Sequence, residues 1–237
     1  MDFYGFYTGK IFDAYKYLGA HTEKQGVTFR TFAPSASRIA LIGEFNDWQE
    51  WDMNKVSDGN FRECYVPQAK AGQMYKYRIY DRSGNAVEHC DPYGFGMELR
   101  PNSASIIRDM NKYKFKDSQW MQNRSDCRKK PLNIYEIHFG SFRKPSDKAD
   151  DWYNYEEMID ILIPYLVKNG YNYLEIMPLN EYPCDESWGY QATGFFSPTS
   201  RYGTADQLKA FVDACHRHGI GVLMDFVPVH FAVDSYG

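Results

Sequence analysis

Asp225 stands where a parallel sheet places its chemistry. It follows an apolar run at residues 220–224 and therefore lies at the carboxyl end of a predicted buried strand. A carboxylate there is costly unless it is paired or hydrogen-bonded, and barrel folds carry their active sites at such strand ends. His230 follows five residues later, and Tyr190 offers a flat aromatic face. Taken singly, the three residues could equally be an aspartate that fixes a loop, a loop histidine and a packing tyrosine.

The second half of the chain alternates strand and helix around these residues. Strands are predicted at 132–139, 171–178 and 220–227, and the last is apolar enough to be buried on both faces. Such β-α-β succession predicts a parallel sheet. The loop at 179–203, which contains Tyr190, is long enough to build an active site.

Two helices are predicted between these strands. Asn154 with Glu157 forms a capping box for the first, and Thr204 with Gln207 forms one for the second. The first helix should end at Asn169-Gly170. The residues expected to be buried are Met158, Ile161, Leu162 and Tyr165 in the first helix, and Leu208, Phe211, Val212 and Cys215 in the second.

In the first half of the chain, apolar residues recur with a different spacing. Residues 1–25 contain one amphipathic segment at 11–18, which predicts a short helix. Residues 26–110 contain short strands separated by turn signals, which is typical of a β-sandwich. Residues 111–131 are polar and basic without periodicity, and are predicted to be a linker to the α/β region at 132–237.

Composition excludes several classes of protein. The net charge of −4 gives no basic field to attract nucleic acid or anionic lipid. The five cysteines are odd in number and lack metal-site spacing, so reduced thiols in the cytoplasm are expected. From the sequence we expect neither a signal segment nor a membrane span, and no glycine-rich phosphate loop supports a nucleotide-binding fold. Aromatic residues reach 17%, which suits either dense packing or sugar binding.

Three segments together resemble the α-amylase superfamily. They are residues 133–142 (NIYEIHFGSF), 187–203 (SWGYQATGFFSPTSRYG) and 212–231 (VDACHRHGIGVLMDFVPVHF). Within it, the text around Gly189-Tyr190-Gln191 and Asp225–His230 is most similar to glycogen branching enzymes. Residues 26–34, 43–48 and 91–93 resemble the family 48 carbohydrate-binding module that precedes their barrel. The resemblance implies an immunoglobulin-like β-sandwich followed by the first three units of a (β/α)8 barrel.

The same resemblance assigns roles to residues. Tyr190 corresponds to the platform beneath the sugar ring at the cleaved bond, Asp225 to a residue that orients the pocket, and His230 to a donor to sugar hydroxyls. Trp48 and Lys76 match glucan-binding positions of the module, although a second tryptophan expected before Asp91-Pro92 is absent.

The resemblance implies transfer of an α-1,4-glucan segment to a 6-hydroxyl by a retaining double displacement, without a cofactor. Its nucleophilic aspartate and acidic glutamate would lie beyond Gly237, so the chain alone is predicted to be inactive and to contain no catalytic residue of its own. Val229 stands where amylases of the superfamily carry a calcium-binding asparagine, and its side chain has no oxygen, so no metal is expected there.

Two alternatives remain open at this point. A debranching or trehalose-forming hydrolase would share the sandwich and the barrel. A non-catalytic glycogen-binding protein would share only the affinity for α-glucan. The sequence makes no prediction of oligomeric state.

Overall fold

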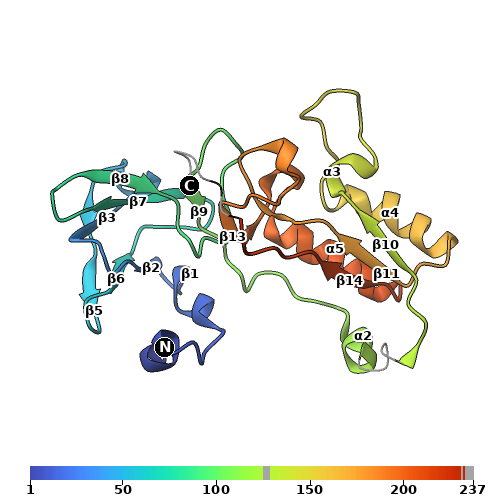
Figure 1. Cartoon of the computed structure of the whole chain (residues 1–237), viewed down its shortest axis with the longest axis horizontal. Coiled ribbons are helices and arrows are strands. Elements are labelled where there is room, and N and C mark those ends of the chain that lie inside the picture. The colour runs from blue at the N-terminus through green and yellow to red at the C-terminus, as the bar shows by residue number, and fades with distance from the viewer. Residues whose placement is uncertain (125–128, 231, 233–237) are drawn as a thin grey trace. The chain divides into compact units, whose positions relative to one another are not determined.

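The computed structural model describes residues 1–124, 129–230 and 232, and its elements are shown in Figure 1. The chain divides into two compact units. The first comprises Met1–Asp109 with Thr193–Ser197 and residue 232, and the second comprises Met110–Ala192 with Pro198–230. Each unit has its own hydrophobic core, in accordance with the change of period seen in the sequence.

The first unit is a β-sandwich, as predicted. One sheet has the order β1-β2-β6-β5, and the other has the order β4-β3-β7-β8 with β9 beside β7. The strands are β1 (Gly19–Thr22), β2 (Val27–Phe32), β3 (Arg38–Gly43), β4 (Trp51–Asp52), β5 (Asn54–Val56), β6 (Phe61–Val66), β7 (Met74–Tyr80), β8 (Ala86–His89) and β9 (Ser105–Ile106). Tyr75 and Tyr77 alternate with Lys76 and Arg78 on β7, so the two tyrosines are buried in the core between the sheets.

The prediction of a helix at 11–18 is wrong. This segment holds only the short 3-10 turn η1 (Ala14–Lys16), and the first helix is α1 (Phe3–Tyr7), which Asp2 caps. Tyr15 is 40% exposed, so the apolar spacing has no surface on which to bury a helical stripe. Leu18 is instead fully buried directly before β1, a strand that pairs with β2.

The second unit is built on a three-stranded parallel sheet. Its strands β10 (Ile134–Ile137), β11 (Tyr173–Ile176) and β14 (Gly221–Met224) lie in that order. Residues from α4 (Glu157–Lys168) and α5 (Ala205–Arg217) pack on one face of this sheet. The remaining elements are α2 (Ser118–Asn123), α3 (Phe139–Phe142), β12 (Asn180–Glu181), η4 (Asp185–Ser187), β13 (Gly194–Pro198) and η5 (Ser200–Tyr202). The short helix α2 falls in the segment predicted to be an irregular linker.

The helix ends follow the sequence signals. The Thr204 side chain accepts a hydrogen bond from the Gln207 amide, and the Gln207 side chain accepts one from the Thr204 amide. Asn154 and Glu157 exchange the same pair of bonds. Both capping boxes are therefore confirmed. Along the helices Met158, Leu162, Phe211 and Cys215 are buried, whereas Ile161, Tyr165, Leu208 and Val212 are half-buried.

The prediction that the third strand is buried on both faces is wrong. Leu223 and Met224 are 38% and 50% exposed. Leu223 shares a face with its register partners Glu136 and Glu175, away from the helix-packed core, whereas Met224 is in register with the core residues Ile137 and Ile176 but ends a strand that is an edge among the described residues. Both residues thus keep apolar surface in contact with water.

None of the described helices is long and apolar enough to cross a membrane. Four cysteines are free, namely Cys64, Cys90, Cys184 and Cys215, and the fifth, Cys127, lies outside the described residues.

Candidate functional site

Tyr190 and Asp225 meet at the carboxyl ends of the parallel strands. The Tyr190 hydroxyl donates a hydrogen bond of 2.7 Å to Oδ2 of Asp225. Asp225 directly follows β14, and its amide donates to the carbonyl of Ile176 at the end of β11, which fixes its place beside that strand. The costly carboxylate thus has a hydrogen-bond partner, as its position required.

The approach of Tyr190 depends on the turn before it. Gly189 has a φ of +90°, and a Cβ on it would lie 2.4 Å from the carbonyl oxygen of Pro178. Only glycine fits this position, because a side chain would meet both a left-handed backbone and a fixed carbonyl. The glycine of the motif therefore brings the tyrosine to the strand ends.

The hydrogen bond also makes the tyrosine hold its proton more tightly. The bond to Asp225, followed by burial and by the charge of Asp225, raises the pKa of Tyr190 to about 12. Near neutral pH the phenol consequently keeps its proton and acts as a donor, and Asp225 acts as the acceptor.

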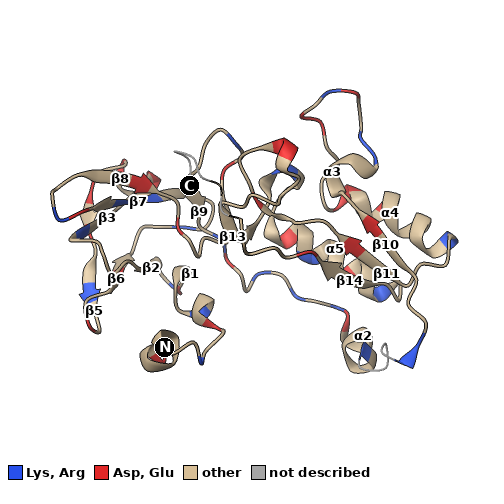
Figure 2. Cartoon of the chain, viewed as in Figure 1, with Lys and Arg blue, Asp and Glu red and all other residues tan. Residues whose placement is uncertain are grey.

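Two glutamates on the sheet add negative charge near this pair. Glu136 of β10 and Glu175 of β11 are register partners, and the charges of both contribute to the raised pKa of Tyr190. Figure 2 shows acidic positions in red on both β10 and β11. Sequence reasoning missed them, although their central position in two predicted strands, one residue from buried neighbours, was a usable signal.

His138 is a further residue of this region that the sequence analysis did not single out. It follows β10, its ring stacks on Trp188 at 5.2 Å between centroids, and its Nδ1 lies 2.8 Å from the Ser141 hydroxyl. Burial, with a smaller effect from Arg201, lowers the pKa of His138, which favours the neutral ring. Its Nε2 is buried and has no hydrogen-bond partner among the described residues.

A buried ion pair fastens the loop that carries Tyr190. The Arg201 side chain is 1% exposed and its Nη1 lies 3.0 Å from Oε1 of Glu181, which is 3% exposed. Its guanidinium also stacks over the Tyr182 ring at 3.7 Å and donates from Nε to Asp185 at 2.9 Å. Glu181 in turn accepts hydrogen bonds from the amide and the hydroxyl of Ser200. The two ends of the loop are therefore tied together.

His230 is not brought to this pair by any hydrogen bond of the described residues. It is exposed and lies six residues beyond the end of β14. The structure thus joins two of the three residues singled out from the sequence. Val229 is 72% exposed, and the described part of the chain contains no group of three or more histidine, cysteine or acidic residues that could hold a metal ion.

In the sandwich, Trp48 and Lys76 lie on neighbouring backbone. Lys76 of β7 pairs with Ile42 of β3, and the Trp48 amide donates to the carbonyl of the next residue, Gly43. Trp48 is 39% exposed and has a φ of +58°. Both residues are therefore held at one end of the β3–β7 ladder.

An ion-pair network covers strands next to Lys76. Arg78 joins Glu50 at 2.9 Å and also pairs with Glu88, and Arg38 joins Glu50 at 2.8 Å. Hydrogen bonds from Tyr80 and Arg78 lower the pKa of Glu50 to about 2. Glu88, which lies near the position expected for a second tryptophan, is thus engaged by Arg78 on the adjacent strand.

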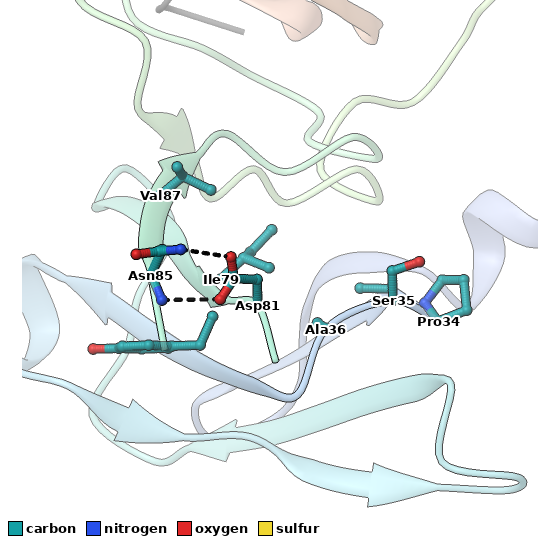
Figure 3. A pocket seen from close by; sticks show the side chains of 9 residues that line it. Pro34, Ser35, Ala36, Ile79, Asp81, Asn85 and Val87 are labelled. Carbon is teal, nitrogen blue, oxygen red and sulfur yellow. Dashed lines mark hydrogen bonds between the residues drawn. The ribbon is translucent and has the colours of Figure 1, made fainter. Parts of the chain in front are cut away.

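A cavity of about 300 Å³ lies elsewhere in the sandwich, between the turn after β2 and the β7–β8 hairpin. Figure 3 shows Pro34, Ser35, Ala36, Ile79, Asp81, Asn85 and Val87 on its walls. The Asp81 carboxylate is occupied by Asn85, which donates to it from its amide and its side chain at 2.9 Å each. Neither Trp48 nor Lys76 lines this cavity, so we assign it no part in sugar binding.

Comparison with known families matches both units. Residues 17–94 match carbohydrate-binding module 48 (isoamylase N-terminal domain), and residues 141–236 match the alpha amylase catalytic domain. The chain belongs to the alpha-amylase family. The predicted sandwich followed by the start of a barrel is thereby confirmed for this member of the family.

Relatives of this alpha-amylase family member carry a more specific name. The 1,4-alpha-glucan branching enzyme GlgB of Fusobacterium nucleatum is 42% identical over 240 residues, with 100% of this chain and 39% of the relative covered. That of Dechloromonas aromatica is 44% identical over 239 residues, with 98% and 38% covered. The chain thus spans about two fifths of the length of these relatives and matches their amino-terminal part.

A solved structure shares the fold. The putative alpha amylase from Salmonella typhimurium superposes with a TM-score of 0.72 at 25% identity, with 92% of this chain and 34% of that one covered.

Proposed function

We propose that this chain forms the sugar-binding, amino-terminal part of a 1,4-α-glucan branching enzyme, which moves an α-1,4-glucan segment onto a 6-hydroxyl of glycogen. The observation that carries the proposal is the Tyr190–Asp225 hydrogen bond of 2.7 Å at the ends of β11 and β14. It joins the two residues that the branching-enzyme motif assigns to one sugar ring, in a chain whose relatives bear that name.

Each residue has a distinct role in this proposal. The Tyr190 ring supports the sugar at the bond to be cleaved, and its hydroxyl is held by Asp225, so the angle of the ring is set before substrate arrives. Asp225 orients the pocket and is not the nucleophile. His230 donates to sugar hydroxyls as positive charge develops at the anomeric carbon. The nucleophile and the acid of the retaining reaction belong to the longer protein.

A chimaera tests the proposal. This chain replaces those 240 residues of the Fusobacterium nucleatum relative with which it aligns over its whole length. The chimaera should form α-1,6 branches in amylose, read from the branch linkages and from the loss of iodine colour. Tyr190→Ala and Asp225→Asn should each lower kcat by about a hundredfold, since contacts made in the transition state are lost.

A second hydrogen bond between a tyrosine and an aspartate provides the control for a general loss of structure. In the same unit, the Tyr113 hydroxyl donates a hydrogen bond of 3.0 Å to Asp213. Asp213 lies on α5 and not at the strand ends. Tyr113→Phe should leave kcat within about twofold. A fall equal to that of the Tyr190 variant, or full activity of the Tyr190→Ala chimaera, would refute the assignment.

A hydrolase is the second candidate, favoured by the likeness to a putative alpha amylase. In the full-length protein from its native source, branches without a rise in reducing ends indicate the transferase, and new reducing ends indicate the hydrolase. The free cysteines of the described residues also support the expectation of a cytoplasmic protein. Trp48 and Lys76 are proposed as a second contact with α-glucan, limited by the missing tryptophan.

A further inference from the structure

A histidine and a tryptophan from distant parts of the sequence stack on each other in the second unit. The His138 ring, directly after β10, lies 5.2 Å between centroids from the Trp188 ring, at an angle of 21°. Trp188 ends η4 in the loop that carries Tyr190, and its φ of +54° is left-handed. A bulky residue keeps this conformation only where its surroundings hold it. The stack on His138 supplies such a hold.

The turn that begins at Trp188 leads directly to Tyr190. Gly189 between them is also left-handed, and the carbonyl of Pro178 lies too close to it for any side chain. The Tyr190 amide donates to the carbonyl of Ser187 at 3.0 Å, which closes the turn. The position of the Trp188 ring therefore bears on that of Tyr190, two residues further along the chain.

His138 is fixed from its own side of the stack. The amides of Ser141 and Phe142 in α3 donate to its carbonyl at 3.2 and 3.1 Å, and its Nδ1 lies 2.8 Å from the Ser141 hydroxyl. Its Nε2 is buried and has no partner within the described ranges. Burial lowers the pKa of His138, since a further proton on Nε2 would lack an acceptor. Among the described residues, the ring thus meets the loop through its flat face and not through a hydrogen bond.

We propose that His138 is a positioning residue for Tyr190. Its ring, held by β10 and α3, packs against Trp188 and keeps the turn at Trp188-Gly189 in the conformation that brings the Tyr190 hydroxyl to Asp225. His138 itself touches no substrate, because the nitrogen that could reach a sugar hydroxyl, Nε2, is buried. The role in catalysis rests on the proposed function, whereas the role in holding the turn does not.

Hydrogen exchange of the 237-residue chain, followed by mass spectrometry at low protein concentration, tests this role. His138→Leu removes the flat ring, so the amides around Tyr190 should exchange faster than in the parent chain by about tenfold or more. His138→Phe restores a flat ring and should stay within about threefold of the parent. Trp188→Leu removes the same stack from a side chain that is 49% exposed, and should match His138→Leu. The amides of β11 should be unchanged in all three variants, because the sheet is not released.

Another histidine–tryptophan stack in the same unit provides the control. His216 of α5 and Trp120 of α2 stack at 5.1 Å and 17°. His216→Leu removes a comparable ring contact from a different place in the unit. It should leave the exchange around Tyr190 within about twofold of the parent.

The chimaera tests whether His138 acts on the reaction through Tyr190. His138→Leu should lower kcat by about tenfold, and His138→Phe should keep it within about threefold of the parent. In the Tyr190→Ala background, His138→Leu should cause no further loss, because a residue that acts through another one is not additive with it.

The outcomes separate the positioning role from the proposed function. Unchanged exchange around Tyr190 in both His138→Leu and Trp188→Leu, or an equal rise in β11 in both, refutes the positioning role. A full additive loss of kcat in the double variant also refutes it. A chimaera that forms no branches, together with faster exchange confined to the loop, refutes the branching function and leaves the positioning role in place.

Discussion

At the scale of single residues, burial decides what each carboxylate and phenol can do. Asp225 accepts the Tyr190 hydroxyl at the open end of the sheet, whereas Asp91 accepts two tyrosine hydroxyls inside the sandwich. In the described part of the chain, the donors to the Asp91 carboxylate are these two hydroxyls and the Tyr93 amide, none of which is a cation. Burial therefore outweighs the stabilising hydrogen bonds and raises the pKa of Asp91 to about 6.

This raised pKa predicts how stability depends on pH. The folded chain holds the Asp91 proton more tightly than the unfolded chain, whose pKa is near 3.8. The protonated Asp91 therefore contributes on the order of 3 kcal/mol to the free energy of unfolding below pH 4. This contribution is lost as pH rises through 6. Asp91→Asn should remove this dependence, measured by urea unfolding between pH 4 and 7.

An exposed aspartate provides the control with the opposite sign. Hydrogen bonds from Asn85 lower the pKa of Asp81, so Asp81→Asn removes a contribution that is lost as pH falls. Equal pH profiles for the parent chain and Asp91→Asn would contradict the account of Asp91.

Some site residues could be predicted from the sequence and others could not. Asp225 was found because a carboxylate after an apolar run demands a partner, and Tyr190 because of its motif. The partnership itself depends on the φ of Gly189 and on the register of β11 and β14, neither of which a single sequence specifies. His138 was missed because its stacking partner, Trp188, lies fifty residues away.

At the scale of elements, the loop between β11 and α5 is held by Arg201. Its partner Glu181 is buried, and burial raises the pKa of that carboxyl while Ser200 and Arg201 oppose the rise. Arg201→Leu would leave the Glu181 charge buried without its cation. We expect a loss of about 3–5 kcal/mol in the free energy of unfolding, larger at pH 7 than at pH 5, because the variant favours a protonated Glu181.

A surface ion pair is the matched control for this measurement. Lys16 and Asp13 lie 3.3 Å apart with side chains 65% and 55% exposed. Lys16→Leu should cost less than about 1 kcal/mol. If the Arg201 variant proved no less stable than the Lys16 variant, the buried pair would not be what fastens the loop.

Elements with local signals were the ones predicted well. Both capping boxes involve residues three apart, so they are specified within one turn of helix. The spacing at 11–18 was also local, yet it gave no helix, because the segment leads directly into β1, whose pairing with β2 the segment alone does not reveal. Helix periodicity is therefore informative only where a second surface covers the apolar face.

At the scale of the whole molecule, the position of the apolar third strand was predicted correctly, whereas its burial on both faces was predicted wrongly. Its composition suits a strand covered on both faces, whereas the described residues cover one face only. A (β/α)8 barrel supplies the missing neighbours to each strand, and three parallel strands are fewer than the eight of a closed barrel.

The open edge of β14 should make the 237-residue chain self-associate. β14 has only β11 as a described neighbour, and its residues Met224 and Leu223 are 50% and 38% exposed. Exposed apolar edge strands pair with other chains, and a lysine on such an edge opposes the pairing by its charge. In sedimentation velocity at two protein concentrations, the parent chain should form dimers and larger species as concentration rises, and Met224→Lys should shift it toward monomer. Tyr4→Lys, which adds the same charge at a 70% exposed position outside any strand, should not. A parent chain that stays monomeric throughout, or an equal shift in both variants, would show that the edge is not the contact.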